Sequence, residues 1–184
     1  VRVAKSHIRV GTFQFGSLLK KKKEFNNLIY YTINRLNPEL ISMKNKYVKF
    51  FEKICELQIN LIIEWMRVGF IHGVMNTDNM SLSGETIDYG PCAYLDIYNP
   101  KTVFSSIDKM GRYSFENQPK IALWNLARLG ETLLYLIDKN ENKAIDCVEK
   151  ILNKYKNLYD TNWNKMMCQK INLEYNNFNQ NLVK

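Results

Sequence analysis

Residues 70–100 read FIHGVMNTDNMSLSGETIDYGPCAYLDIYNP, and this stretch differs in texture from the sequence on either side. Short apolar stretches are broken by Asn, Asp, Gly and Pro, and the helical period is absent. The pair Ser83-Gly84 indicates a hairpin turn between two short strands. A polar loop held between hydrophobic helices is where a rigid scaffold commonly presents its functional groups. We therefore expect the functional site in this segment.

Helical patterns flank the segment on both sides. Apolar residues from Tyr47 to Val68 recur at helical spacing, and Gly69 suits the left-handed turn that follows a helix end. Further helices are expected over Glu24–Arg35, from Gln118 onward, from about Asn142 to Leu158, and after Asp160. The sequence therefore predicts an α+β domain that is mostly α, with a small β element at its centre.

The composition fits one globular domain with a buried core. The chain has 184 residues, of which 46% are hydrophobic, and a domain of this length can bury a substantial core. The sequence has no run of about 18 apolar residues, which a membrane-spanning helix needs, so no membrane partner is expected. The chain does not begin with Met and lacks the apolar core of a signal peptide, so we expect it to start within a longer reading frame.

Charge and cysteine content limit the partners and the compartment. The net charge of +8 admits nucleic acid, an anionic membrane surface or a phosphorylated ligand. Lys20 to Lys23 form one dense basic run, which we expect to face solvent at a turn or helix end, with nucleic-acid binding as the alternative. The four cysteines form no C-x-x-C pair, which argues against a zinc site or a disulfide scaffold and favours a reducing, cytoplasm-like compartment.

The order of polar residues in the central segment suits a nucleotide-dependent transferase. Such an enzyme needs carboxylate or amide oxygens to hold Mg²⁺ against the phosphates, and usually a carboxylate at the acceptor hydroxyl. His72-Gly73 opens a loop, Asn79 ends it, and a D-x-G element at Asp88 follows the expected hairpin. Kinases share this order, since an Asn ends their catalytic loop and an Asp opens the next element.

One position departs from the kinase pattern. Kinases place an Asp two residues after the loop His, whereas this chain has Val74 there. A valine cannot accept a proton, so phosphoryl transfer with the usual base is not expected. The only carboxylate inside the loop is Asp78, directly before Asn79.

The stretch WMRVGFIHGVMNTDNMSLSGETIDYGP, residues 65–91, resembles the signature of the selenoprotein O (YdiU) family, which is kinase-like. The flanking pieces SHIRVGTFQF, PKTVFSSID, GRYSFENQP and IALWNLARLGETLLYLID agree, so the resemblance covers residues 1 to about 138. It implies a protein-kinase-like C-lobe in which the small hairpin carries the metal site. We expect residues 1–184 to form a single partial kinase-like domain, with 1–46 as the end of the N-lobe and a connecting helix, and 47–184 as the helical C-lobe.

The resemblance also implies an activity and a set of site residues. The family transfers AMP from ATP to Ser, Thr or Tyr hydroxyls of proteins (adenylylation), with Mg²⁺, or alternatively Mn²⁺, as cofactor. Asp78 matches the family's proton acceptor, and Asn79 and Asp88 match its metal ligands. Arg2 and Arg9 match the arginines that bind the nucleotide together with Asp88, and a guanidinium fork suits phosphate oxygens.

Several readings of the function stay open at this stage. Kinase-like enzymes also use an N-terminal lobe with a Gly-rich loop and a strand Lys, and this sequence contains neither. We therefore expect a piece of a longer enzyme, impaired on its own, whose N-lobe could come from a separate chain. The alternatives are UMP transfer, a catalytically inactive kinase-like binding or scaffold remnant, and a true kinase in which Asp78 replaces the usual base. ATP and protein substrates are the expected partners, without nucleic acid, in the bacterial cytoplasm or, for a eukaryotic protein, the mitochondrion.

Residues beside the motif receive structural expectations. We expect His72 to brace the loop rather than act as an acid or base, and Met75 and Tyr89 to serve as packing residues. Cys55 and Cys147 lie on apolar helical faces and are expected to be core thiols.

Overall fold

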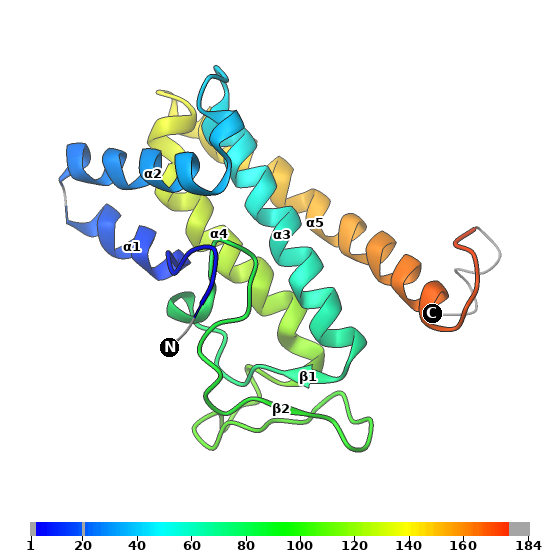
Figure 1. Cartoon of the computed structure of the whole chain (residues 1–184). Helices are drawn as coiled ribbons and strands as arrows, with labels where there is room; N and C mark the ends of the chain where they lie inside the picture. Colours follow the sequence, from blue (N-terminus) through cyan, green and yellow to red (C-terminus); the bar gives the residue numbers. More distant parts are fainter. Residues whose placement is uncertain (1–2, 20, 177–184) are drawn as a thin grey trace.

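The computed structural model describes residues 3–19 and 21–176. Its helices and strands, in chain order, are α1 (Val10–Leu18), α2 (Lys22–Leu36), η1 (Pro38–Leu40), α3 (Lys46–Arg67), β1 (Phe70–Ile71), η2 (Thr77–Asn79), β2 (Ala93–Tyr94), η3 (Phe115–Asn117), α4 (Gln118–Ile137) and α5 (Glu141–Lys170), where η marks a short 3₁₀ helix. In Figure 1, α3, α4 and α5 run alongside one another, α1 and α2 lie to one side, and the two strands lie at the lower end. The predicted class, α+β and mostly α, is confirmed.

The core lies where α3, α4 and α5 meet. Phe51 and Ile54 of α3, Leu129 of α4 and Val148 of α5 are all buried there, and each such side chain contributes about 1.5–3 kcal/mol on leaving water. The helices approach most closely at Gly130 of α4, where an added Cβ would lie 2.6 Å from Val148 and 3.1 Å from the ring of Phe51. The three helices are therefore closely packed and can support the central segment.

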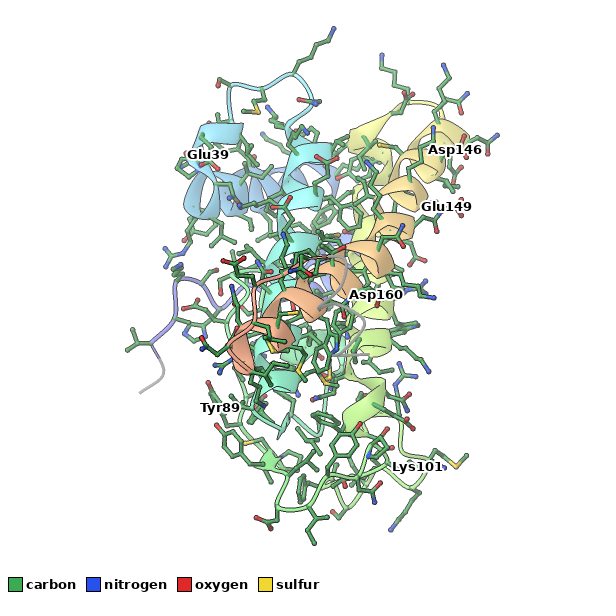
Figure 2. All side chains as sticks on the ribbon, turned by 90° about the vertical axis from the view of Figure 1, so that its right-hand side faces the viewer. Glu39, Tyr89, Lys101, Asp146, Glu149 and Asp160 are labelled. Atoms are coloured by element: carbon green, nitrogen blue, oxygen red, sulfur yellow. The ribbon has the colours of Figure 1, made fainter. Side chains whose placement is uncertain are left out.

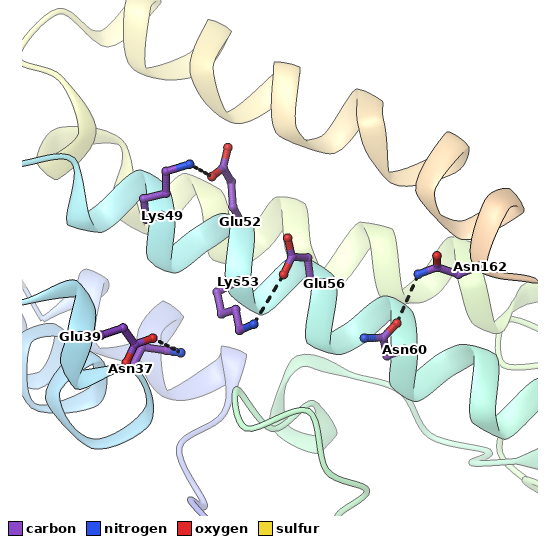
Figure 3. Close-up of polar contacts among 8 residues, drawn as sticks. All are labelled: Asn37, Glu39, Lys49, Glu52, Lys53, Glu56, Asn60 and Asn162. Atoms are coloured by element: carbon purple, nitrogen blue, oxygen red, sulfur yellow. Dashed lines mark hydrogen bonds and ion pairs between the residues drawn. The ribbon is translucent and has the colours of Figure 1, made fainter. Parts of the chain in front are cut away.

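Polar contacts mark the outer side of this helix group. Asn162 of α5 donates a 3.3 Å hydrogen bond to Asn60 of α3, while Lys49–Glu52 and Lys53–Glu56 pair along α3 itself (Figure 3). Exposed pairs of this kind add little to stability, because solvent screens the attraction between the charges. They support the solvent face of α3, and the buried apolar face holds the helix in place.

α3, α2 and α4 lie where the sequence predicts them, within two residues, but α5 differs from the prediction. The sequence suggests that one helix ends near Leu158 and another follows Asp160, whereas α5 is continuous over 30 residues. Tyr155, Tyr159 and Trp163 stack in turn, with ring centroids 6.4 and 6.2 Å apart. Side chains four residues apart meet on one helix face, so this aromatic ladder carries the helix through Asp160.

α1 was not expected from the apolar pattern of the sequence. Val10 and Phe13 point inward, but Phe15 is 65% exposed and Leu18 is 76% exposed, so the apolar residues occupy two faces and leave no helical period. The ring of Phe13 packs edge-on to Phe25 at 5.8 Å. Tertiary packing therefore fixes this helix, and its amphipathic pattern does not reveal it.

The predicted hairpin at Ser83-Gly84 is present as a turn, but its strands are not. Gly84 has φ 69°, donates a 3.2 Å bond to Ser81, and sits inside a single antiparallel bridge between Met80 and Thr86. The two-stranded sheet of the described residues instead pairs β1 with β2, with Phe70 opposite Tyr94. That pairing joins segments on either side of the turn and was not expected.

Burial differs between the cysteines and the basic run. Cys55 is a buried free thiol as predicted, and burial raises the pKa of its thiol, whereas Cys147 is only half-buried. Lys21 to Lys23 are exposed at the start of α2, as expected for a basic run at a helix end, and Lys20 lies outside the described residues. Within residues 3–19 and 21–176, no helix is both long and apolar enough to cross a membrane.

Candidate functional site

His72 connects two parts of the central segment. Its side chain is fully buried, its Nδ1 accepts a 3.4 Å bond from the Val74 amide, and its Nε2 lies 2.8 Å from the Ile87 carbonyl. The carbonyl can only accept, so Nε2 carries the proton. Burial lowers the pKa of His72, against smaller opposing effects from the Ile87 bond and the Asp88 charge. The expected bracing role is confirmed, because this neutral ring ties the loop to the residues just before Asp88.

α4 holds the start of the loop through two buried amide side chains. Gln118 accepts a 3.0 Å bond from the His72 amide and donates a 2.9 Å bond to the Phe70 carbonyl. Asn125, two turns further along α4, donates a 2.9 Å bond to the Met75 carbonyl. Met75 itself is fully buried, which confirms its expected packing role. The loop backbone is therefore fixed to the helix at three points.

α3 holds the middle of the segment in the same manner. Gln58 donates a 2.6 Å bond to the Ser81 carbonyl, and Trp65 donates a 2.8 Å bond from its indole nitrogen to Thr86 Oγ1. The Trp65 ring also packs against His72 at a tilt of 31°, with centroids 5.3 Å apart. The first half of the segment is therefore held by two long helices, which suits a site that needs fixed geometry.

The chain before α1 pairs with residues 80–82, directly after the loop that ends at Asn79. Leu82 donates a 2.9 Å bond to the Ile8 carbonyl and Val10 donates a 3.0 Å bond to the Met80 carbonyl, which places Arg9 opposite Ser81. In Figure 1 this dark blue segment runs beside the green loop that follows β1. Arg9 is half-buried, and its Nε atom is buried without a hydrogen-bond partner among the described residues. A buried guanidinium nitrogen of this kind suits an anionic ligand.

Asp78 and Asn79 lie in η2, next to the first turn of α1. The backbone of Gly11 approaches Asp78 so closely that an added Cβ would lie 3.0 Å from Asp78 Cγ. Asp78 itself is exposed. Asn79 donates a 2.9 Å bond from its amide nitrogen to the Val74 carbonyl. That bond uses the nitrogen end of the amide, so the oxygen end is the one that could bind a cation.

Asp88 has an unusual backbone conformation. Its φ is 60°, in the left-handed region, and Gly90 donates a 2.8 Å bond back to its carbonyl. A non-glycine residue there costs about 1–2 kcal/mol, and surroundings that hold such strain often mark functional positions. Gly73, with φ 84°, lies so close to the next turn that an added Cβ would be 2.9 Å from Pro91 Cγ. The start of the loop and the turn after Asp88 are therefore packed together.

Tyr89 is placed differently from the prediction. It was expected to pack, yet its side chain is 60% exposed and only its ring edge approaches Phe70, at 6.5 Å between centroids. In Figure 2 it lies near the same end of the molecule as Lys101, far from Glu39.

The whole chain, residues 1–184, matches the model of a family described as protein adenylyltransferase SelO. The chain belongs to the SelO family. It is 54% identical over 172 residues to the protein nucleotidyltransferase YdiU of Pelagibacter ubique, 54% over 173 residues to that of Rhizobium etli, and 52% over 177 residues to that of Lachnoclostridium phytofermentans. These matches cover 94%, 94% and 96% of this chain but only 36%, 35% and 37% of the relatives. The chain thus spans little more than a third of the curated relatives it matches.

Within this SelO-family chain, described contacts join the segments that hold four of the predicted site residues. Arg9 lies opposite Ser81, Asp78 lies on the first turn of α1, and His72 links the loop that ends at Asn79 to the residue before Asp88. Arg2 lies outside the described residues. The family assignment is confirmed, while the roles of these residues stay predictions.

The structure adds residues that the sequence analysis missed in this SelO-family site. Gln58 and Trp65 are seven residues apart on α3, and Gln118 and Asn125 are seven apart on α4, so each pair shares a helix face. Polar or amphipathic side chains repeated at that spacing on an apolar helix face could have indicated contacts between the helix and a loop. Gly11 gives a weaker signal, because a single glycine in a short helix has many explanations.

Proposed function

We propose that the chain forms the catalytic part of a protein nucleotidyltransferase, which transfers AMP from ATP to Ser, Thr or Tyr hydroxyls of acceptor proteins. The observation that carries the proposal is that the segments bearing Arg9, Asp78, Asn79 and Asp88 converge in a chain that matches the SelO family along its whole length. In this proposal residues 47–184 are a kinase-like C-lobe and residues 1–46 are the end of the N-lobe with a connecting helix. Acceptor proteins are its partners and a reducing compartment is its setting.

The residues present fit a magnesium–nucleotide complex. Among the described residues no three His, Cys, Asp or Glu side chains gather into a metal site. Mg²⁺ in nucleotide enzymes needs no such cage, because it is bound through one or two protein oxygens together with substrate phosphates and waters. The Asn79 amide oxygen and the Asp88 carboxylate would supply these oxygens. When bound, the cation offsets negative charge on the phosphate oxygens.

The proposed chemistry assigns one task to each residue. The acceptor oxygen attacks the α-phosphorus of ATP, the bond from that phosphorus to the bridging oxygen breaks, and pyrophosphate leaves with the bonding pair. Asp78 takes the proton of the acceptor hydroxyl, because Val74 stands where kinases place their base and cannot accept one. Arg9 stabilises the charge on the phosphate oxygens through its unpartnered guanidinium nitrogen. No covalent enzyme intermediate is needed.

The test uses the complete polypeptide that carries these residues and compares ATP labelled at two different phosphates. Incubation with Mg²⁺ and ATP labelled at the α-phosphate should leave label on protein, whereas ATP labelled at the γ-phosphate should leave none. Label from the γ-phosphate would make the protein a kinase. An arm with α-labelled UTP decides between AMP and UMP, since the relatives are called nucleotidyltransferases without a stated nucleotide.

Two substitutions separate metal binding from proton transfer. Asp88→Asn removes the charged ligand but keeps a residue that tolerates the left-handed backbone, so Mg²⁺-dependent ATP binding in a calorimeter should be lost. Asp78→Asn should leave that binding intact and slow transfer by about 10²–10⁴-fold, the usual contribution of a general base. Asp96→Asn, an exposed carboxylate in the following loop, is the matched control. Unchanged ATP binding in the Asp88 variant would overturn the metal assignment.

A further inference from the structure

Gly11 is the residue that makes room for the Asp78 carboxylate. An ideal Cβ at Gly11 would lie 3.0 Å from Asp78 Cγ, 3.3 Å from the Asp78 backbone nitrogen, and closer still to Asp78 Oδ1. Cβ contacts of this kind are shorter than packed interiors accept, so only glycine allows the carboxylate its present position. The most obstructed atom is the free end of a side chain, so a methyl group at residue 11 would displace the carboxylate and shift the Asp78 backbone nitrogen by only a few tenths of an ångström.

The first turn of α1 is itself fixed against the loop. Thr12 Oγ1 accepts a 3.2 Å bond from the Arg9 amide, and the Thr12 amide donates a 3.1 Å bond to the Arg9 carbonyl. Val10 donates to Met80, as described above. The amide groups of a first helical turn carry partial positive charge, which favours a carboxylate placed over them. The turn beside Asp78 is therefore held in place by hydrogen bonds of its own residues and by the bond to Met80.

We infer that Gly11 is a positioning residue, because its lack of a side chain lets the Asp78 carboxylate lie against the first turn of α1, the turn that Arg9 directly precedes. The inference rests on the proposed function, in which Asp78 accepts the proton and Arg9 binds the phosphates. One helical turn then sets the distance between the base and the phosphate being attacked. A displacement of about 1 Å in such a geometry can cost about 10²-fold in rate.

The first experiment separates rate from affinity in Gly11→Ala. The kcat for transfer from α-labelled ATP should fall about 10–100-fold, while the Kd for Mg²⁺·ATP in a calorimeter should change by less than about 3-fold, a small fraction of one binding contact. Gly16→Ala is the matched control, because its added Cβ also overpacks α1, at 2.8 Å from the ring of Phe25 and away from the loop. Its kcat should stay within about twofold of wild type. A Gly11→Ala enzyme with wild-type kcat would overturn the inference.

A double-mutant cycle tests whether Gly11 acts through Asp78. In an Asp78→Ala background no carboxylate is left to displace, so Gly11→Ala should lower the residual transfer rate far less than it lowers the wild-type rate. A merely structural role would instead lower the rate in both backgrounds by the same factor. Equal losses in the two backgrounds would therefore refute a positioning role.

A third readout does not depend on activity. In ¹⁵N-labelled protein, Gly11→Ala should shift the backbone amide resonances of residues 77–79, whereas Gly16→Ala should shift those around Phe25 and leave 77–79 unmoved. If the wild-type protein transfers no label but the Gly11 shifts are seen, the proposed function fails and the contact between Gly11 and Asp78 stands. If residues 77–79 do not respond to Gly11→Ala, the inference fails whatever the activity.

Discussion

Substitution of Gln118 tests how strongly α4 holds the loop. Its buried amide accepts from His72 at 3.0 Å and donates to Phe70 at 2.9 Å. Gln118→Ala leaves a buried N–H and a buried C=O without these partners, at about 1–3 kcal/mol for each group. We expect the free energy of unfolding to fall by about 3 kcal/mol in total. The loss stays below the sum of the two upper values because water can enter the space left by the side chain and bond to the exposed groups. For a domain of this size such a loss lowers Tm by about 6–12 °C.

Urea unfolding followed by circular dichroism measures the effect. Gln118→Met keeps the side-chain volume but loses both bonds, so it separates the cost of the unpaired groups from the cost of a cavity. Gln118→Met should therefore retain most of the destabilisation. Gln169→Ala, an exposed glutamine on α5, is the control and should change the free energy of unfolding by less than about 0.5 kcal/mol. If both Gln118 variants unfold at the wild-type urea concentration, the bonds to the loop do not contribute to stability and the mounting described here is refuted.

Two further outcomes follow from the contacts around His72. Burial lowers its pKa below the unfolded value of 6.5, so the unfolded state binds more protons below that pH. The free energy of unfolding should then be at its full value above pH 6.5 and fall by up to about 1.4 kcal/mol per unit as the pH drops toward the folded pKa. Urea titrations should show this slope flattened in His72→Gln but not in His7→Gln, an exposed control; equal slopes would contradict it. Trp65→Phe loses the 2.8 Å bond to Thr86 and should cost about 1 kcal/mol in the same assay, and an unchanged midpoint would show that the bond carries no net stability.

The long helices could be predicted from sequence because each buries one apolar stripe. α3 begins and ends within one residue of its prediction, since a single face from Phe50 to Trp65 carries its core residues. α1 could not be predicted in this way, because Phe15 and Leu18 face solvent while Phe13 faces the core. A break was expected at Asp160, but α5 continues through it. Contacts between aromatic residues four positions apart extend the helix through these polar positions.

In the candidate site, residues close together in the sequence could be predicted, whereas contacts between residues far apart in the sequence could not. His72, Asn79 and Asp88 fall within one short stretch, so their order was visible in the sequence alone. The support that Gln118 gives to His72 joins residues 46 positions apart and has no local signature. The pairing of β1 with β2 also joins residues distant in sequence. The sequence predicted the turn at Ser83-Gly84 but not which strands pair on either side of it. What the sequence leaves out is which buried amide reaches which backbone group.

The pairing of the segment before α1 with the end of the loop has a consequence for folding. Ser6 and Ser81 meet through a hydrogen bond that closes a chain loop of 75 residues. Closing so long a loop costs conformational entropy before the contact contributes any stabilising free energy. Contacts between residues distant in sequence therefore form slowly. Only three residues, 138–140, connect α4 to α5, so these helices can pair early. We expect the helices to assemble first and the N-terminal segment to close over the loop last, which would make Arg9 the latest of the described site residues to reach its place.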